Sequence, residues 1–286
     1  MIEYGNLYVE KKRNKSEVQR RKRDRRLKKL LLGLAILILI LLIYIIFTLC
    51  SLIGKTLEYQ KEENDERVVV KDTEKEMFID KYKGIPDELL AILDKNPETE
   101  EFVLNYPLKK GEYSKAGLNE CLNQSKVPLL LQWDSRWGYY EYGSSVIGVT
   151  GCGPTCLSMV SIHLLQDAKL TPVYMADYAK ENGYYADGIG TAWDFMTYGA
   201  ENLGLNAQEV TLDENVVMRH LRQGRPIICA MGPGVFTESG HFIVLVGVED
   251  GKIRVNDPNS KARSEKLWDF EDFKYQIKNM WAYSVR

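Results

Sequence analysis

Three short segments of the chain carry the side chains of a covalent hydrolase. They are residues 151–155, 240–245 and 256–258, and their reactive groups are the thiol of Cys152, the imidazole of His241 and the carboxylate of Asp257. In acyl transfer a thiolate attacks the carbonyl carbon, an imidazole moves the proton, and a carboxylate orients the imidazole. The sequence therefore predicts a cysteine nucleophile site, if the fold brings the three segments together.

The setting of Cys152 favours its ionised form. Pro154 suits the first turn of a helix and an apolar face follows it, so we expect a helix over residues 154–165 with Cys152 at its start. Unpaired backbone N–H groups and the positive end of the helix dipole lower the pKa of a thiol from its usual value of about 8.5. Gly151 and Gly153 leave the thiol uncovered.

His241 and Asp257 lie beside two predicted strands. His241 precedes the apolar run 242–248, which is typical of a buried strand, and Asp257 follows a predicted strand over residues 252–255. Pro258 then forces the chain out of the sheet. We expect His241 to act as general base and acid, and Asp257 to orient its ring and stabilise the charged form.

Other residues compete for these roles. Cys156 lies one helical turn after Cys152, where packing or a disulfide is the simpler interpretation. His163 lies too far along the predicted helix to reach Cys152, and we expect His220 to be solvated on an amphipathic helix over residues 214–222. Cys152 could itself be a small buried hydrophobic residue, and Asp257 an ordinary turn residue.

Gln132 is the candidate for a fourth group. The tetrahedral intermediate of acyl transfer needs a hydrogen-bond donor beside the cysteine N–H, and a side-chain amide can supply it. Gln132 ends an apolar run over residues 127–131 and stands 20 residues before Cys152. Its amide could instead cap a turn.

Together these segments resemble the C39-like peptidases, papain-like cysteine peptidases related to the domain that trims double-glycine leader peptides in bacteriocin exporters. The motifs that carry the resemblance are Gln132-Trp133-Asp134, Arg136-Trp137, Gly151-Cys152-Gly153-Pro154-Thr155, Gly190-Thr191, Gly240-His241-Phe242 and Asn256-Asp257-Pro258. The resemblance covers residues 127–286, with a weaker likeness over 96–107. It implies Cys152 as nucleophile, His241 as base, Asp257 as orienter and Gln132 as oxyanion donor.

Two departures separate the chain from exporter-fused members of that family. Those members place the oxyanion glutamine close before the cysteine, whereas the sixth residue before Cys152 here is Val146. The sequence also contains no glycine-rich phosphate loop ending in Gly-Lys-Ser/Thr, so it carries no ATPase signature. Both features indicate the free-standing branch, for which leader peptides of an attached exporter are a poor choice of substrate.

The pattern of the C-terminal half predicts an α+β fold. We expect helices over residues 154–165, 172–182, 192–203 and 214–222, and strands over 226–231, 242–248, 252–255 and 280–285. A cysteine helix packed on an antiparallel sheet that carries the histidine is the papain-like arrangement that the resemblance implies. Two short helices over 86–94 and 98–105, the second ending before Pro107, are expected ahead of it.

A long apolar segment predicts a membrane anchor. Residues 30–53 hold no charge and, at 1.5 Å per residue, are long enough to cross a hydrocarbon core of roughly 30 Å. Twelve Lys or Arg residues precede it, so the positive-inside rule places the N-terminus in the cytoplasm and the C-terminal domain outside. A cleaved signal peptide is disfavoured by the length of the apolar run, and a lipoprotein at Cys50 by the bulky Leu49 before it.

The sequence therefore divides into four parts. These are a basic cytoplasmic tail (1–29), a transmembrane helix (30–53), a charged stalk with short helices (54–125) and a C39-like peptidase domain (126–286). Outside the tail the formal charge is −10, which argues against nucleic acid as a partner. No Cys or His cluster has zinc-ligand spacing, and we expect neither a metal nor another cofactor.

These observations predict a bacterial, membrane-anchored cysteine peptidase whose active site faces the outside of the cell. Its substrate would be a peptide or protein. Three alternatives stay open: an amidase or endopeptidase acting on the stem peptides of peptidoglycan, a non-catalytic module that binds a peptide in the same groove, and transfer chemistry as in transglutaminase-like relatives. Each uses the same groove, so the sequence alone does not separate them.

Overall fold

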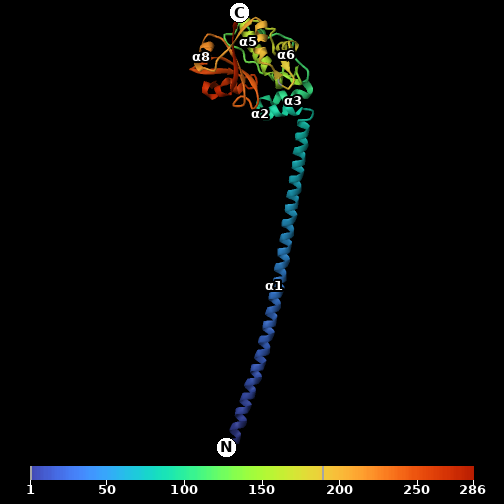
Figure 1. The fold of residues 1–286 in the computed structure, drawn as a ribbon. Helices are drawn as coiled ribbons and strands as arrows, with labels where there is room; N and C mark the ends of the chain where they lie inside the picture. Colours follow the sequence, from blue (N-terminus) through green and yellow to red (C-terminus); the bar gives the residue numbers. More distant parts are fainter. Residues whose placement is uncertain (1, 189) are drawn as a thin grey trace. The chain divides into compact units, whose positions relative to one another are not determined.

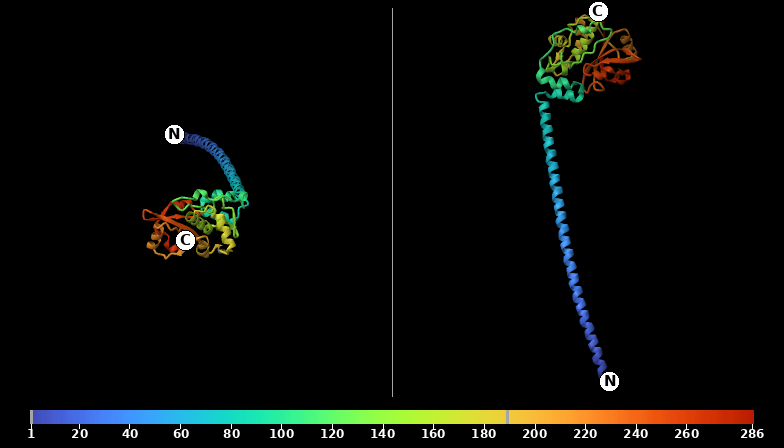
Figure 2. Two further views of the ribbon diagram at one scale, coloured as in Figure 1. Left: turned by 90° about the horizontal axis from the view of Figure 1, so that it is seen from above. Right: turned by 180° about the vertical axis from the view of Figure 1, so that it is seen from behind.

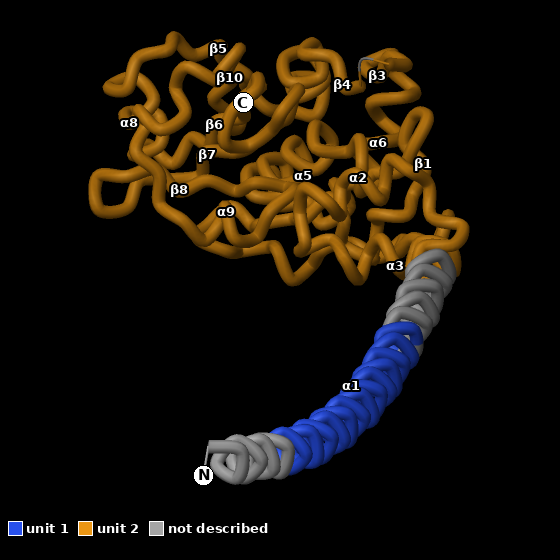
Figure 3. The backbone as a smooth tube through the Cα atoms, turned by 90° about the horizontal axis from the view of Figure 1, so that it is seen from below, with its two compact units in different colours: residues 1–80 blue, residues 81–286 orange. Residues whose placement is uncertain are grey.

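The computed structural model describes residues 17–61, 63, 81–188 and 190–286 in full, and it divides the chain into two compact units, 1–80 and 81–286 (Figure 3). The first unit consists of helix α1, which is continuous from Ile2 to Lys81. Within the described residues, Glu17–Lys61 is the segment long and apolar enough to cross a membrane. Residues 1–16 of the predicted tail and residues 62 and 64–80 of the predicted stalk lie outside the fully described residues.

The second unit is built around a six-stranded antiparallel sheet (Figure 1). The strands stand in the order β5-β10-β6-β7-β8-β9. Their bounds are Leu205–Glu209 (β5), Ile227–Met231 (β6), His241–Glu249 (β7), Lys252–Asn256 (β8), Leu267–Trp268 (β9) and Ile277–Val285 (β10). Strands β6, β7 and β8 follow one another in sequence and pair as neighbours, so the sheet presents the start of β7 and the end of β8 on adjacent strands.

Alternation along the central strands fills a core on each face of the sheet. In β7, Phe242 and Val244 belong to one core cluster, and Ile243 and Leu245 belong to another. Successive side chains of a strand point to opposite faces, so a continuous apolar run is what a strand covered on both sides requires. The buried strand that the sequence predicts over residues 242–248 is present as part of β7.

Helices cover both faces. Helices α5 (Cys152–Leu165) and α6 (Pro172–Glu181) pack in the first cluster, and α8 (Glu214–Arg222) packs in the second. Figure 2, from behind, shows the yellow-green helical part and the orange to red strands as neighbouring halves of this unit. The predicted α+β arrangement, a helix beginning at the cysteine packed on an antiparallel sheet, is confirmed.

A third, smaller cluster lies at the start of the second unit. It joins Leu89 of α2 (Asp87–Lys95) and Phe102 of α3 (Glu100–Lys109) to Tyr139, which is also buried. The 3-10 turn η1 (Pro97–Thr99) connects the two helices, and Asn96 caps it. Helix α3 runs through Pro107, although we expected it to end before that residue; Pro107 lies in the last turn, where little of the helix remains for it to disrupt.

Short elements complete the unit. They are η2 (Asn119–Cys121), β1 (Glu141–Tyr142), β2 (Ser145–Val146), α4 (Ile147–Thr150), β3 (Tyr185–Ala186), β4 (Gly190–Thr191), η3 (Phe195–Gly199), α7 (Ala200–Asn202), α9 (Lys261–Glu265), η4 (Phe270–Asp272) and η5 (Lys274–Gln276). The helix predicted over 192–203 is a π-helical turn followed by a single α-turn. Strands β5 and β9 were not predicted from the sequence.

Candidate active site

Cys152 is the first residue of α5, and Gly151 is its N-cap. The side chain is half-buried. Gly153 lets the start of the helix approach strand β4, because a Cβ atom on Gly153 would lie only 2.8 Å from the Cβ and Oγ1 atoms of Thr191. The glycine after the cysteine is therefore required by close packing, and it also leaves the thiol uncovered.

His241 is the first residue of β7, where Met231 of β6 is its partner in the ladder. Its Nε2 atom lies 2.8 Å from Oδ1 of Asp257, and its side chain is 8% exposed. The imidazole and the thiol of Cys152 are also close enough to shift each other's pKa. Since Nε2 faces the carboxylate, Nδ1 is the ring nitrogen left for the sulfur.

Asp257 directly follows β8, and its side chain is fully buried. Besides His241, its carboxylate accepts hydrogen bonds from the backbone N–H of Asn259 (2.8 Å) and from Nε of Arg263 (2.5 Å). Its own N–H donates to Oγ of Ser264 at 2.8 Å. Three contacts therefore fix the orientation of a carboxylate that would be costly to bury unpaired, and the bond to Ser264 holds its backbone.

Charge coupling among the three groups favours their ionised forms. Burial alone would raise the pKa of Cys152, but the hydrogen bond and charge of His241 outweigh burial and lower it. Burial would lower the pKa of His241, yet Asp257 and Cys152 raise it to about 10. Burial would likewise raise the pKa of Asp257, and His241 and Arg263 lower it instead. A thiolate facing an imidazolium is the state that these shifts favour near neutral pH.

Gln132 is also buried and lies beside the same cleft. Its Nε2 donates to the carbonyl of Gly148 at 2.9 Å and, less closely, to that of Val149 at 3.3 Å, while its Oε1 has no partner. The contact with Gly148 fixes which way the amide is turned, because the opposite orientation would place two oxygen atoms together. The backbone N–H of Gln132 donates to Pro258, which ties this segment to the Asp257 loop.

A cleft of about 380 Å³ runs over these residues. It is lined by Gln132, Cys152, His241, Asn259 and Arg263, by the loop 234–240, and by Ile92 and Lys95 of α2. Lys95 forms an ion pair with Glu238 of the loop at 2.5 Å, so two walls of the cleft are linked. Because Cys152 is one of the lining residues, a ligand in this cleft would meet the thiol.

The structure thus brings Cys152, His241, Asp257 and Gln132 to one place. Cys156 is fully buried in α5 and burial raises its pKa, so it is a packed thiol. His220 is buried on α8, with a pKa lowered by burial, and our expectation that it is solvated was wrong because its ring shares the core face with Val217 and Leu221. His163 has a pKa lowered by burial and no partner for its Nδ1.

Arg263 is the residue of the site that the sequence did not indicate. It holds the second carboxylate oxygen of Asp257 from helix α9, at an ion-pair distance of 2.5 Å. Arg263 belongs to no recognisable sequence motif, because its contact with Asp257 forms only when α9 packs beside β8. Among the described residues, no group of three His, Cys, Asp or Glu side chains is arranged to hold a metal ion.

Comparison with known proteins gives one family. The model of the Peptidase_C39 like family matches residues 124–286, which is more than half of the chain. Among solved structures, the peptidase domain of Streptococcus ComA, a bi-functional ABC transporter involved in a quorum sensing pathway, is 16% identical, with 56% of this chain and 99% of that chain covered at a TM-score of 0.40. A C39-like peptidase from Bacillus anthracis is 14% identical, with 60% and 98% covered at a TM-score of 0.38. No curated protein is similar enough to count as a match.

Proposed function

Because the chain belongs to the Peptidase_C39 like family, we propose that it is a cysteine peptidase in which Cys152, His241 and Asp257 hydrolyse peptide bonds. The observation that carries this proposal is the connected set of contacts at the cleft. Cys152 and His241 line the same cleft and shift each other's pKa, and Nε2 of His241 lies 2.8 Å from the buried carboxylate of Asp257. A nucleophile, a base and an orienter in contact are what covalent hydrolysis requires.

The reaction follows from these positions. The thiolate of Cys152 attacks the peptide carbonyl carbon and forms a tetrahedral intermediate. The imidazolium of His241 then gives its proton to the departing amine, which leaves an acyl-enzyme thioester. His241, now neutral, takes a proton from water, and the resulting hydroxide attacks the thioester carbonyl. The carbon–sulfur bond then breaks, which releases the acid and returns Cys152 as a thiolate beside the His241 imidazolium.

Gln132 supports the oxyanion in this proposal. One hydrogen of its amide is held by Gly148, and the longer contact to Val149 is the one that an oxyanion in the cleft would replace. The backbone N–H of Cys152 is the second donor, because the first N–H groups of a helix have no partner within that helix.

We also propose that the peptidase acts outside the cell from a single membrane anchor. The apolar residues 30–53, preceded by the basic run, support this topology by composition and length. A tag at the C-terminus should be removed by protease added to intact protoplasts, while a tag at the N-terminus should be protected. The reverse pattern would overturn the orientation.

A thiol-directed peptide electrophile tests the nucleophile. The full chain in detergent is treated with it, and the modified cysteine is mapped by mass spectrometry in wild type, Cys152→Ala, His241→Ala and the control Cys156→Ala. We expect rapid labelling at Cys152 that His241→Ala slows and Cys156→Ala leaves unchanged. Slow labelling that does not depend on His241 would favour a non-catalytic binding module.

Substrate digestion then identifies the bond cleaved. Unstructured peptides and soluble peptidoglycan fragments are offered to the wild type and to Cys152→Ala, and the products are identified by mass spectrometry. Hydrolysis of general peptides supports the peptidase proposal. Cleavage confined to the stem peptides of peptidoglycan would instead assign the enzyme to cell-wall turnover.

A further inference from the structure

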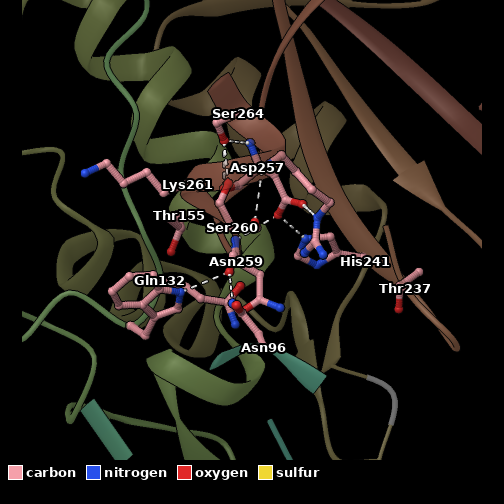
Figure 4. Close-up of polar contacts among 12 residues, drawn as sticks. Asn96, Gln132, Thr155, Thr237, His241, Asp257, Asn259, Ser260, Lys261 and Ser264 are labelled. Atoms are coloured by element: carbon pink, nitrogen blue, oxygen red, sulfur yellow. Dashed lines mark hydrogen bonds and ion pairs between the residues drawn. The ribbon is translucent and has the colours of Figure 1, made fainter. Parts of the chain in front are cut away.

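The loop that carries Asp257 is held from a distant part of the chain. The carbonyl of Asn259 accepts hydrogen bonds from Nδ2 of Asn96 (2.5 Å) and from Nε1 of Trp133 (3.0 Å), and Figure 4 shows Asn96 and Asn259 facing one another next to Asp257. The N–H of Asn259 is directed to the carboxylate of Asp257. Asn259 is thus held at both of its backbone polar groups, its carbonyl by Asn96 and Trp133 and its N–H by Asp257, and this helps to fix where the carboxylate lies.

Glu98 holds the next part of the same loop. Its carboxylate accepts hydrogen bonds from Oγ of Ser260 (2.6 Å) and from the backbone N–H groups of Lys261 (2.9 Å) and Ala262 (3.3 Å). These two N–H groups begin helix α9 and have no partner inside it. A carboxylate is the favoured partner for such donors, so Glu98 fastens the start of α9.

Helix α9 in turn carries the arginine that meets Asp257. Oγ of Ser260, which donates to Glu98, accepts a hydrogen bond from the backbone N–H of Arg263 at 3.1 Å. Nε of Arg263 then donates to the second carboxylate oxygen of Asp257. Hydrogen bonds therefore connect Glu98 to Ser260, Ser260 to Arg263 and Arg263 to Asp257 in one continuous chain.

We infer that Glu98 is a positioning residue for the proposed reaction, which acts on Asp257 through helix α9. The inference rests on the proposed function and extends it to a segment that lies before residue 124, where the family match begins. Glu98 is half-buried and does not line the cleft, so it does not meet substrate. Its loss should therefore lower kcat and leave KM nearly unchanged.

Iodoacetamide measures the effect without any substrate. The rate of alkylation at Cys152 follows the fraction of thiolate, so its pH profile reports how well Asp257 supports the His241 imidazolium. The full chain in detergent is compared as wild type, Glu98→Gln and Asp257→Asn, with Cys152 mapped by mass spectrometry. Glu100→Gln is the matched control, because Glu100 lies two residues away and pairs with the exposed Lys81.

We expect Glu98→Gln to slow alkylation at pH 6 by about 5-fold, with little change at pH 9, and Asp257→Asn to slow it further. Glu100→Gln should follow the wild type. In the double variant Glu98→Gln/Asp257→Asn, the profile should equal that of Asp257→Asn alone, because a residue acting through Asp257 has nothing left to position.

The outcomes separate this inference from the proposed function. If wild-type Cys152 is unreactive at pH 6, the proposed function fails and the inference fails with it. If the wild type is reactive and Glu98→Gln shares its profile, only the inference is overturned. A further loss in the double variant, together with a lower melting temperature, would make Glu98 a stabilising residue and would also overturn it.

Discussion

Nε2 of His241 lies 2.8 Å from Oδ1 of Asp257, and the two residues come from adjacent strands of one antiparallel ladder. Strand β7 begins at His241, and β8 ends one residue before Asp257. Their pairing places Val244 opposite Asn256 and so brings the carboxylate alongside the ring. A hairpin, rather than a mobile loop, therefore sets the distance between base and orienter.

Asp257→Asn should remove most of the activity without unfolding the protein. An asparagine has a similar shape, but it cannot stabilise the imidazolium of His241, and we expect kcat/KM to fall by about 100-fold. The control is Asp269→Asn, since Asp269 pairs with Lys252 on the exposed surface. Peptide hydrolysis and a melting curve of each variant provide the measurement, and equal losses in the two variants would contradict the role of Asp257.

Activity should depend on pH through two groups. The thiolate of Cys152 and the imidazolium of His241 exist together only above the lowered pKa of Cys152 and below the raised pKa of His241, which is about 10. We therefore expect kcat/KM to rise on the acidic side as the pair forms and to fall as the pH passes about 10, when His241 loses its proton. A pH profile of hydrolysis checks this, and a fall centred near pH 6.5 would contradict it.

Gln132→Ala should lower kcat by about 100-fold while leaving the alkylation rate of Cys152 unchanged. An oxyanion donor acts on the intermediate, so its removal does not alter the thiolate. Gln124→Ala is the control, because Gln124 is an exposed amide that donates to a backbone carbonyl. If Gln132→Ala slows alkylation and hydrolysis equally, Gln132 maintains the geometry of the site and does not stabilise the oxyanion of the intermediate.

Gly153→Ala should destabilise the second unit by about 1–3 kcal/mol and reduce labelling of Cys152. The new methyl group would press on Thr191, which is buried and whose Oγ1 lies 2.8 Å from the hydroxyl of Tyr142. Gly247→Ala is a fair comparison, since nothing lies within 4 Å of the position its Cβ would take. Chemical denaturation of both variants gives the free energies of unfolding, and equal values would show that α5 can move aside.

The sequence was most informative where a residue and its neighbours act locally. The apolar runs of β6 and β7 predicted strands because a sheet covered on both faces buries successive residues, and β8 was predicted from its alternating Ile253 and Val255. The start of α5 followed from Pro154 and the glycines around Cys152. Strand β9 has two residues and β5 has a single buried position, so neither produces a period that can be recognised.

Contacts between distant segments were beyond sequence reasoning. Arg263 belongs to no motif, and Glu98 lies in the 96–107 stretch of weaker family likeness, but the contacts of both residues depend on helix α9, which has only five residues. The burial of His220 depends on which face of α8 meets the sheet. Tertiary packing determines these contacts and this burial, and the local sequence propensities do not predict them.

The hydrogen bond between Asn96 and Asn259 spans 163 positions of the chain, and His241 and Asp257 likewise lie far along the chain from Cys152. Contacts of high sequence separation close late in folding. During synthesis at about 5–20 residues per second, His241 and Asp257 follow Cys152 by roughly 5–20 s. A nascent chain thus carries an ordinary thiol, and its reactivity appears only when the final strands have been added. Assembly order keeps the nucleophile latent while the chain is being made.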